Sequence, residues 1–138
     1  MSNKTIRALL EGRLKTWAAA RSPALRIAYQ DVEFTPSAGE TYLQCFVLPA
    51  DMDSQDFAGE HKLYRGVWQV TIVKPKGKGL PAALAIEDEL AALYPNNLKL
   101  SSGSFDLFIR SPMGSGPALT DELNTRVPVS CQYRADTI

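Results

Sequence analysis

Histidine is almost missing from this chain, and cysteine is scarce. His61 is the only histidine among 138 residues, and Cys45 and Cys131 are the only cysteines. A zinc site gathers several nitrogen or thiolate ligands, so one histidine without a nearby thiolate argues against such a site. The same scarcity argues against proton relays between histidines, and the sequence contains no Gly-x-Ser-x-Gly nucleophile elbow. We therefore expect a protein that is not an enzyme and that holds no metal ion or cofactor.

Neither sign of charge is in excess, and long apolar runs are absent. Fifteen Lys and Arg residues balance fifteen Asp and Glu residues, so the formal net charge is zero. A protein that mainly binds nucleic acid carries a basic excess, so neutrality disfavours that function and leaves room only for a local patch. No apolar run approaches the ~20 residues of a membrane-spanning helix, and no signal peptide is visible. We expect no membrane partner, assembly in a reducing cytoplasm, and two buried, reduced cysteines.

What is present fits a single α+β domain over residues 1–138. Hydrophobic residues make up 45% of the chain, which is enough to bury a core without metals or disulfides. Apolar residues at helical spacing predict helices over 3–20 and 80–94, with Pro81 in the first turn of the second. Strands are predicted at 41–48, 63–73, 98–101, 104–110 and 125–134, with a short extended piece at 27–29.

The order of these elements, α-β-β-α-β-β-β, predicts the architecture. We expect a mixed, mostly antiparallel sheet of about four to five strands with both helices packed on one face. Strand 41–48 is apolar on both faces, which indicates either burial on both sides or an interface. Pro128 cannot donate a ladder hydrogen bond, so the last strand is expected at a sheet edge or with a bulge. Long polar loops are expected at 50–62 and 111–123.

The strongest strand signal lies in residues 63–73. Its alternate residues share one face because side chains alternate along a strand. A Pro/Gly-rich turn then leads directly into the second helix. The residues predicted to share the buried face are Tyr64, Trp68, Val70 and Ile72.

Two loops carry weak signals of ligand binding. Backbone amides before a helix can cradle phosphate, and Lys74, Lys76 and Lys78 add positive charge there. The Gly-Lys-Ser/Thr ending of a nucleotide-binding loop is missing, so a solvated turn is the better interpretation. Residues 51–56 resemble the start of a calcium loop, but Asp56 stands where that loop needs glycine and its final Glu is missing.

Two charged residues fall within apolar helix stripes. Arg13 projects between Ile6 and Trp17 on the first helix, and Glu87 projects onto the apolar side of the second. An ion pair between the two packed helices would compensate both charges. The favoured alternative is that each side chain lies at the margin of its stripe and reaches water.

Four segments carry a resemblance to a known family. None contains a catalytic motif, but their order and spacing extend from the Trp17 helix to the C-terminal Arg-Ala-Asp-Thr. The chain resembles the tail-terminator-like proteins of long-tailed bacteriophages and prophages, which are also described as tail-completion or minor tail proteins. The segments are Tyr42-Leu43 through Leu48-Pro49-Ala50, Tyr64-Arg65-Gly66-Val67-Trp68-Gln69-Val70, Pro75 to Gly79, and Arg126-Val127-Pro128-Val129 through Tyr133-Arg134-Ala135-Asp136-Thr137.

The resemblance implies a structural function in virion assembly. Members are expected to form rings, commonly hexamers, on the end of the tail tube in the host cytoplasm. Such a ring stops tube polymerisation and offers a surface for head attachment. The implied partners are further copies of the chain, the tail tube protein and a head-completion or neck protein, and the implied location is the virion tail.

The two long loops are the candidate subunit contacts. Closed rings use two different patches of one subunit, and Met52, Phe57, Met113 and Leu119 are apolar residues in otherwise polar loops. Alternatively, these side chains pin the loops to their own domain. Two other functions stay open, namely another neck or head–tail connector protein of similar fold, and a module that binds phosphate or nucleic acid through the Lys74–Lys78 loop. Sequence-specific nucleic-acid recognition is not expected.

Overall fold

The computed structural model describes residues 3–50, 62–77, 79–103 and 105–137. Two helices, α1 (Asn3–Ala20) and α2 (Pro81–Leu93), accompany one sheet. The strands are β1 (Ile27–Ala28), β2 (Tyr42–Pro49), β3 (Lys62–Pro75), β4 (Lys99–Ser102), β5 (Phe105–Ile109), β6 (Gly114–Ser115), β7 (Leu119–Thr120) and β8 (Asn124–Thr137).

The sheet has the order β1-β2-β3-β8-β5-β4, and β6 and β7 also pair with β8. Only β1 and β2 run parallel, so the predicted mixed, mostly antiparallel α+β fold is confirmed. The predicted number of four to five strands is wrong, because the described residues form eight. The additional strands β1, β6 and β7 are two residues long, which is too short to produce a period-2 pattern in the sequence.

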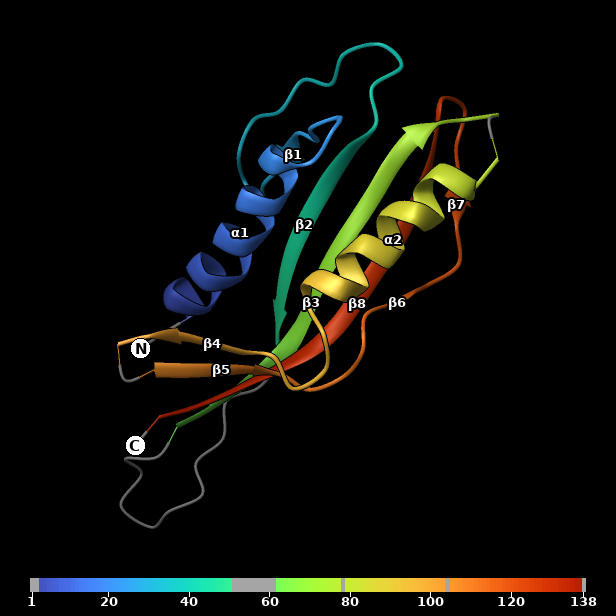
Figure 1. The fold of residues 1–138 in the computed structure, drawn as a ribbon. Coiled ribbons are helices and arrows are strands. Elements are labelled where there is room, and N and C mark those ends of the chain that lie inside the picture. Colours follow the sequence, from blue (N-terminus) through green and yellow to red (C-terminus); the bar gives the residue numbers. More distant parts are fainter. Residues whose placement is uncertain (1–2, 51–61, 78, 104, 138) are drawn as a thin grey trace.

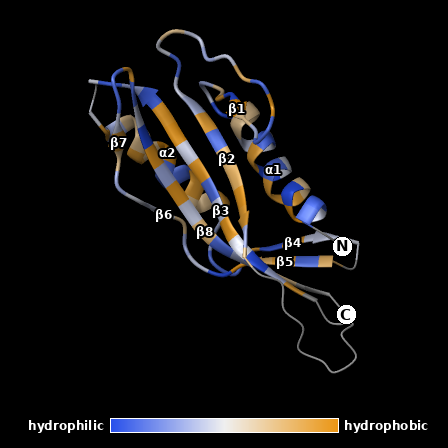
Figure 2. Cartoon of the chain, turned by 180° about the vertical axis from the view of Figure 1, so that it is seen from behind, coloured by the Kyte–Doolittle hydropathy of each residue, from blue (hydrophilic) through white to orange (hydrophobic). Residues whose placement is uncertain are grey.

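Both helices cover the same face of the sheet, which is called the front face below (Figures 1 and 2). Their buried side chains recur at helical spacing, as in Ile6, Leu10 and Leu14 of α1. The opposite face, called the back face, has no helix of the described residues on it (Figure 2). The front-face core against the helices consists of Leu43, Cys45, Val47, Trp68, Val70, Ile72, Val127, Val129, Cys131 and Tyr133, all buried.

Strand β3 confirms the predicted alternation. Its predicted front-face residues are all buried, and Trp68 has no exposed surface. Strand β2 is different, because Cys45 is buried on the front face while Phe46 is only half-buried and Leu48 is 46% exposed on the back face. On that same back face Tyr42 is buried, and its ring centroid lies 4.9 Å from that of Phe34. Strand β2 is therefore buried on both sides at its start, and its back face becomes accessible only toward Leu48, where an interface stays a prediction.

The prediction that the last strand lies at a sheet edge or carries a bulge is wrong. Strand β8 lies inside the sheet between β3 and β5, and its register with β3 is continuous through Pro128. The carbonyl of Pro128 accepts a hydrogen bond from the Gly116 amide at 2.8 Å, away from β3. The N and C=O of one strand residue point to the same side, so the missing proline donor faces the short strands β6 and β7. Proline is tolerated there because that side of β8 is only intermittently paired.

Gly66 occupies a crowded point of β3, where it pairs with Pro49 of β2 and Tyr133 of β8. A Cβ atom at this position would lie 2.5 Å from the Leu48 carbonyl oxygen and 2.7 Å from the Tyr133 hydroxyl. Both distances are far below van der Waals contact. Glycine is thus required by the close approach of a neighbouring strand and an aromatic side chain.

Candidate assembly surfaces

Hydrogen bonds join α1 to the C-terminal end of α2. Arg13 Nε donates to the Leu93 carbonyl at 2.7 Å, and the buried Tyr94 hydroxyl donates to the Leu10 carbonyl at 2.7 Å. A cation at a helix C-terminus also interacts favourably with the helix dipole. No ion pair joins Arg13 to Glu87 among the described residues, and Glu87 Oε1 is buried without a hydrogen-bond partner there. The alternative of an Arg13–Glu87 pair is therefore not supported.

The observed ion pair between the helices is a different one. Arg21 donates to both carboxylate oxygens of Glu89, at 3.2 and 2.8 Å, and lies 5.7 Å from the centre of the Trp17 ring. Sequence analysis missed this pair because the two residues are 68 positions apart. The only local indication of this ion pair in the sequence was the position of Arg21 at the end of the first predicted helix.

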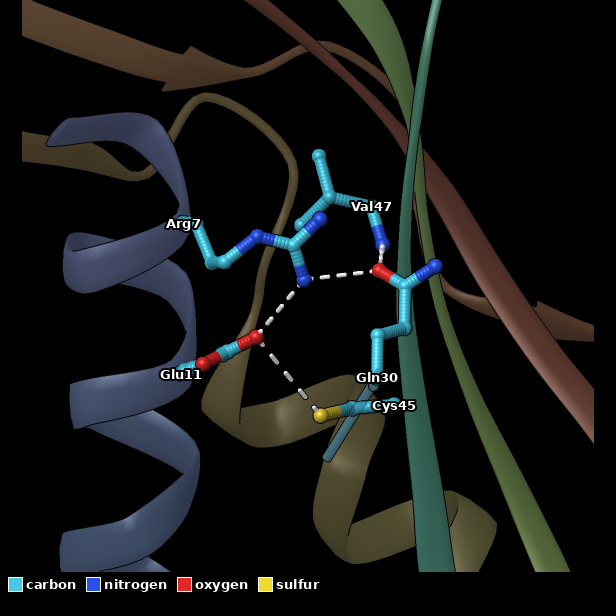
Figure 3. Close-up of polar contacts among 5 residues, drawn as sticks. All are labelled: Arg7, Glu11, Gln30, Cys45 and Val47. Carbon is cyan, nitrogen blue, oxygen red and sulfur yellow. Dashed lines mark hydrogen bonds and ion pairs between the residues drawn. The ribbon is translucent and has the colours of Figure 1, made fainter. Parts of the chain in front are cut away.

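Arg7, Glu11 and Gln30 line part of a groove along α1 and form a polar network, which is shown in Figure 3. Arg7 Nη1 donates to Glu11 Oε2 at 3.0 Å and to Gln30 Oε1 at 2.7 Å. The same Gln30 oxygen accepts a hydrogen bond from the Val47 amide at 3.0 Å. Strand β1 ends at Ala28, so the Gln30 side chain replaces the backbone acceptor that a longer β1 would supply to β2. The i, i+4 spacing of Arg7 and Glu11 is visible in the sequence, whereas the contribution of Gln30 is not.

The groove itself is open and has a volume of about 770 Å³. Helix α1 contributes Ala8, Gly12 and Lys15 to its lining, and the segment after β1 contributes Tyr29 and Val32. Val32 is 60% exposed although it is apolar. The groove is thus a shallow surface with mixed polarity.

Neither cysteine is suited to nucleophilic chemistry. Both are free and buried, as predicted. Burial raises the pKa of the Cys45 thiol to about 12, with Glu11 adding to the effect, and burial alone raises the pKa of Cys131 to about 12. A thiol with so high a pKa stays protonated at neutral pH and is a poor nucleophile.

The two described lysines before α2, Lys74 and Lys76, do not project together. Lys74 is buried, and its Nζ donates to the Pro75 carbonyl at 3.1 Å, whereas Lys76 is exposed. Lys78 lies outside the described residues. The turn uses positive φ at Gly77 and Gly79, and no side chain caps the N-terminus of α2. Phosphate binding by this loop stays a prediction.

The two described candidate contact residues, Met113 and Leu119, lie in different environments. Met113 is buried in the core, as expected of a side chain that pins its loop to the domain. Leu119 in β7 is 64% exposed. Met52 and Phe57 lie outside the described residues, as do His61 and the calcium-like segment 51–56.

A tight turn between β7 and β8 displays a further apolar residue. Asp121 Oδ1 accepts hydrogen bonds from the Leu123 amide at 2.9 Å and the Asn124 amide at 2.8 Å, and Oδ2 pairs with Arg126. These backbone hydrogen bonds, followed by Arg126, lower the pKa of the Asp121 carboxyl to about 2. Leu123 is 78% exposed on this well-defined turn. The sequence placed the turn in a long loop and gave no sign of this exposed leucine.

Other kinds of site were also sought. Within the described part of the chain, no group of three His, Cys, Asp or Glu side chains is placed to hold a metal ion. No helix there is both long and apolar enough to cross a membrane. The accessible features include the α1 groove, the exposed β7–β8 turn and the part of the back face around Arg65 and Leu48. A small α+β domain with these features fits the class of structural proteins that act through contacts with other subunits.

Comparison with known proteins identifies the family. The model of the phage tail terminator protein family matches residues 5–133, so the chain belongs to that family. It is a structural protein of phage tail assembly and a component of the virion tail. Eight chains of solved structures match, and one of them is 43% identical with a TM-score of 0.85 over 100% of this chain and 98% of its own. No curated protein matches.

Proposed function

We propose that this chain forms a hexameric ring that caps the tail tube, stops its polymerisation and presents the surface for head joining. The observation that carries the proposal is the family match over residues 5–133. The proposed partners are further copies of the chain, the tail tube protein and a head-completion or neck protein. Assembly is proposed to occur in the host cytoplasm without a cofactor, a membrane or sequence-specific nucleic acid.

The positions of the surfaces support a head-to-tail ring. A closed ring with such interfaces needs two different patches on each subunit. Helix α1 lies on one flank of the domain, whereas β6 and β7 lie on the other (Figures 1 and 2). Residues of α1 line the groove described above. Exposed Leu119 and Leu123 on the second flank are the proposed anchors, and Met52 and Phe57 stay proposed contacts.

The structure also changes how Met113 would contribute. Because Met113 is buried in the core, its proposed role is to fix residues 111–123 so that Leu119 is presented to a neighbour. Deletion of residues 113–119 would remove a core side chain together with the surface. Point substitutions are therefore the better test of these contacts.

The decisive experiment is electron microscopy of virions produced without this protein. Tails should then contain tubes of uncontrolled length, and expression of the wild-type chain in trans should restore a uniform length. The variants Leu119→Asp and Leu123→Asp should fail to restore it, whereas Leu84→Asp, at an exposed apolar position of α2, serves as a matched control. Tails of uniform length without heads would instead identify a neck or connector protein.

A further inference from the structure

Two exposed surfaces of the domain differ in shape. The first is the groove along α1, with a volume of about 770 Å³. The second is the turn over residues 121–124 between β7 and β8, which carries the exposed Leu123 and is called the leucine turn below. Helix α1 and strand β7 lie on opposite flanks (Figures 1 and 2). A concave surface and an exposed turn are the two different patches that a head-to-tail contact between identical subunits needs.

The groove has room for a partner because α1 contributes small residues to it. Ala8 and Gly12 are exposed lining residues four positions apart, so they lie on the same side of the helix. Nothing lies within 4 Å of a Cβ atom built at Gly12, so the space above this residue is open. The groove volume falls in the range of about 300–1,000 Å³ that is typical of ligand-binding clefts. Several side chains of a partner can therefore enter it.

The leucine turn is held in one conformation by its own hydrogen bonds. Asp121 accepts hydrogen bonds from the Leu123 and Asn124 amides and pairs with Arg126. The Leu123 carbonyl accepts a hydrogen bond from the Lys76 amide at 3.1 Å, which joins the turn to the segment after β3. Leu123 is therefore presented on a preorganised support, and binding through such a residue loses less conformational entropy than binding through a loose loop.

The groove presents one cation and one anion beside an apolar side chain. Its charged lining residues Arg7 and Glu11 pair with each other at 3.0 Å. The other two charged lining residues, Lys15 and Asp31, are exposed and have no ion-pair partner among the described residues. The apolar side chain is that of Val32, which is 60% exposed.

The leucine turn presents the same combination. Asp121 and Arg126 pair with each other. Glu122 of the turn and the adjoining Lys76 are exposed, and neither has an ion pair within the described part of the chain. Each surface therefore offers an exposed apolar residue, one cation and one anion, so each can supply the charges that the other attracts.

We propose that the groove along α1 holds the leucine turn of a second copy of this chain, with Leu123 against Val32 and the small residues of α1. The proposal rests on the proposed function, because it names the two patches that meet in the ring. A second copy fits because the two surfaces complement each other in shape and charge, and because their positions on opposite flanks let the contact repeat around a ring. Lys15 of one subunit then faces Glu122 of the next, and the anion of the groove faces the cation beside the turn.

The test is cysteine cross-linking of the full-length chain, both in purified tails and in a concentrated solution of the purified protein. In the double variant Val32→Cys/Leu123→Cys, a short bismaleimide should link neighbouring subunits and give a ladder of covalent oligomers in denaturing gels. The native Cys45 and Cys131 are buried and do not compete. Each single variant should give no ladder, because one cysteine cannot link two different patches. Leu84→Cys/Leu123→Cys, which uses an exposed apolar position of α2, is the matched control and should give none.

Charge reversal in the double cysteine variant gives a second readout. Lys15→Glu and Glu122→Lys should each lower the cross-linking yield about fivefold or more, and the two together should restore it. Asp88→Lys, at an exposed position of α2, should change the yield less than about twofold. Gly12→Leu should abolish the ladder because its side chain fills the open groove. Melting temperatures near that of the wild type separate lost contact from misfolding in every variant.

Three results would overturn this contact. They are a missing ladder in both samples, a ladder in a single-cysteine variant, which would mean that identical patches meet, and a failure of the paired charge reversals to restore the yield. The contact and the capping function can fail separately. Controlled tail length by a chain that gives no ladder would refute the contact and keep the cap. A ladder in the purified protein, together with uniform tails in virions that lack the chain, would keep the contact and refute the cap.

Discussion

The two faces of the sheet differ along the middle of β3, from Arg65 to Gln69, whereas Leu63 and Val73 of the back face are as buried as the front face. On β3, Trp68 is fully buried on the front face, while its neighbours Val67 and Gln69 on the back face are only half-buried. The front face is almost entirely apolar and is covered by two helices (Figure 2). The back face mixes apolar side chains with arginines. Because side chains alternate, the middle of one strand supplies core side chains on one side and accessible side chains on the other.

The largest expected effect comes from adjacent residues on opposite faces. Trp68→Ala should lower the free energy of unfolding by about 3–5 kcal/mol, because it leaves a cavity in a fully buried site. Val67→Ala, one position earlier, should lower it by less than about 1 kcal/mol, because the side chain is half-buried. Urea unfolding of both variants measures the difference. Similar losses would mean that the back face is covered as tightly as the front.

Substitutions of two glycines by alanine compare a tightly packed position with an open one. Gly66→Ala should cost about 1–3 kcal/mol, because the new Cβ would meet backbone atoms of β2 that cannot yield without moving a strand. Gly12→Ala in α1 should instead stabilise by about 0.5–1 kcal/mol, since nothing lies within 4 Å of the new Cβ and alanine favours helix. Thermal unfolding of both variants tests the sign. A destabilised Gly12→Ala would contradict the open environment assigned to it.

The contacts between the helices should contribute less than the front-face core. Arg13→Met keeps the apolar stem and removes the donor to Leu93, so we expect a loss of about 1–2 kcal/mol in urea unfolding. Arg21→Met breaks a partly exposed ion pair and should cost less than about 1 kcal/mol. Glu87→Leu should be neutral or stabilising, because it removes a buried oxygen without a described partner. Equal, large losses of unfolding free energy in Arg13→Met and Glu87→Leu would support an ion pair between Arg13 and Glu87.

Most of the front face could be predicted from the sequence, because its signals are periodic. Apolar spacing located both helices, and alternation in residues 63–73 identified the buried face that contains Trp68. The position of the last strand could not be predicted in this way. Pro128 indicates only that one backbone hydrogen-bond donor is missing. Which side of β8 tolerates the missing donor depends on the pairing of β6 and β7, and tertiary contacts determine that pairing.

The candidate surfaces were less predictable than the core. Leu119 was identified because an apolar residue in a polar loop is visible locally. The proximity of Arg65, Arg110 and Arg134 was missed because the three residues are distant in sequence, and only the fold brings them together around one cavity. Lys74 shows the opposite error. It stands next to other lysines in the sequence, but in the fold its side chain is buried and donates a hydrogen bond to a backbone carbonyl. Charged residues that are close in the sequence are thus not always close in the fold, and residues that are close in the fold are not always close in the sequence.

The smallest expected effect concerns pH, and it separates the exposed turn from the buried front face. The folded pKa of Asp121, about 2, lies below its ordinary value of 3.8, so its stabilisation is present above that value and is lost as the pH falls through about 2. The Cys45 and Cys131 thiols have pKa values raised from 9.0 to about 12, so their contribution is fully present below 9.0 and is lost as the pH rises through about 12. Asp121→Asn should therefore be slightly less stable than wild type at about pH 7 and equal to it near pH 2. Urea unfolding across this range measures the difference, and a constant gap at every pH would show that the charge of Asp121 does not hold the turn.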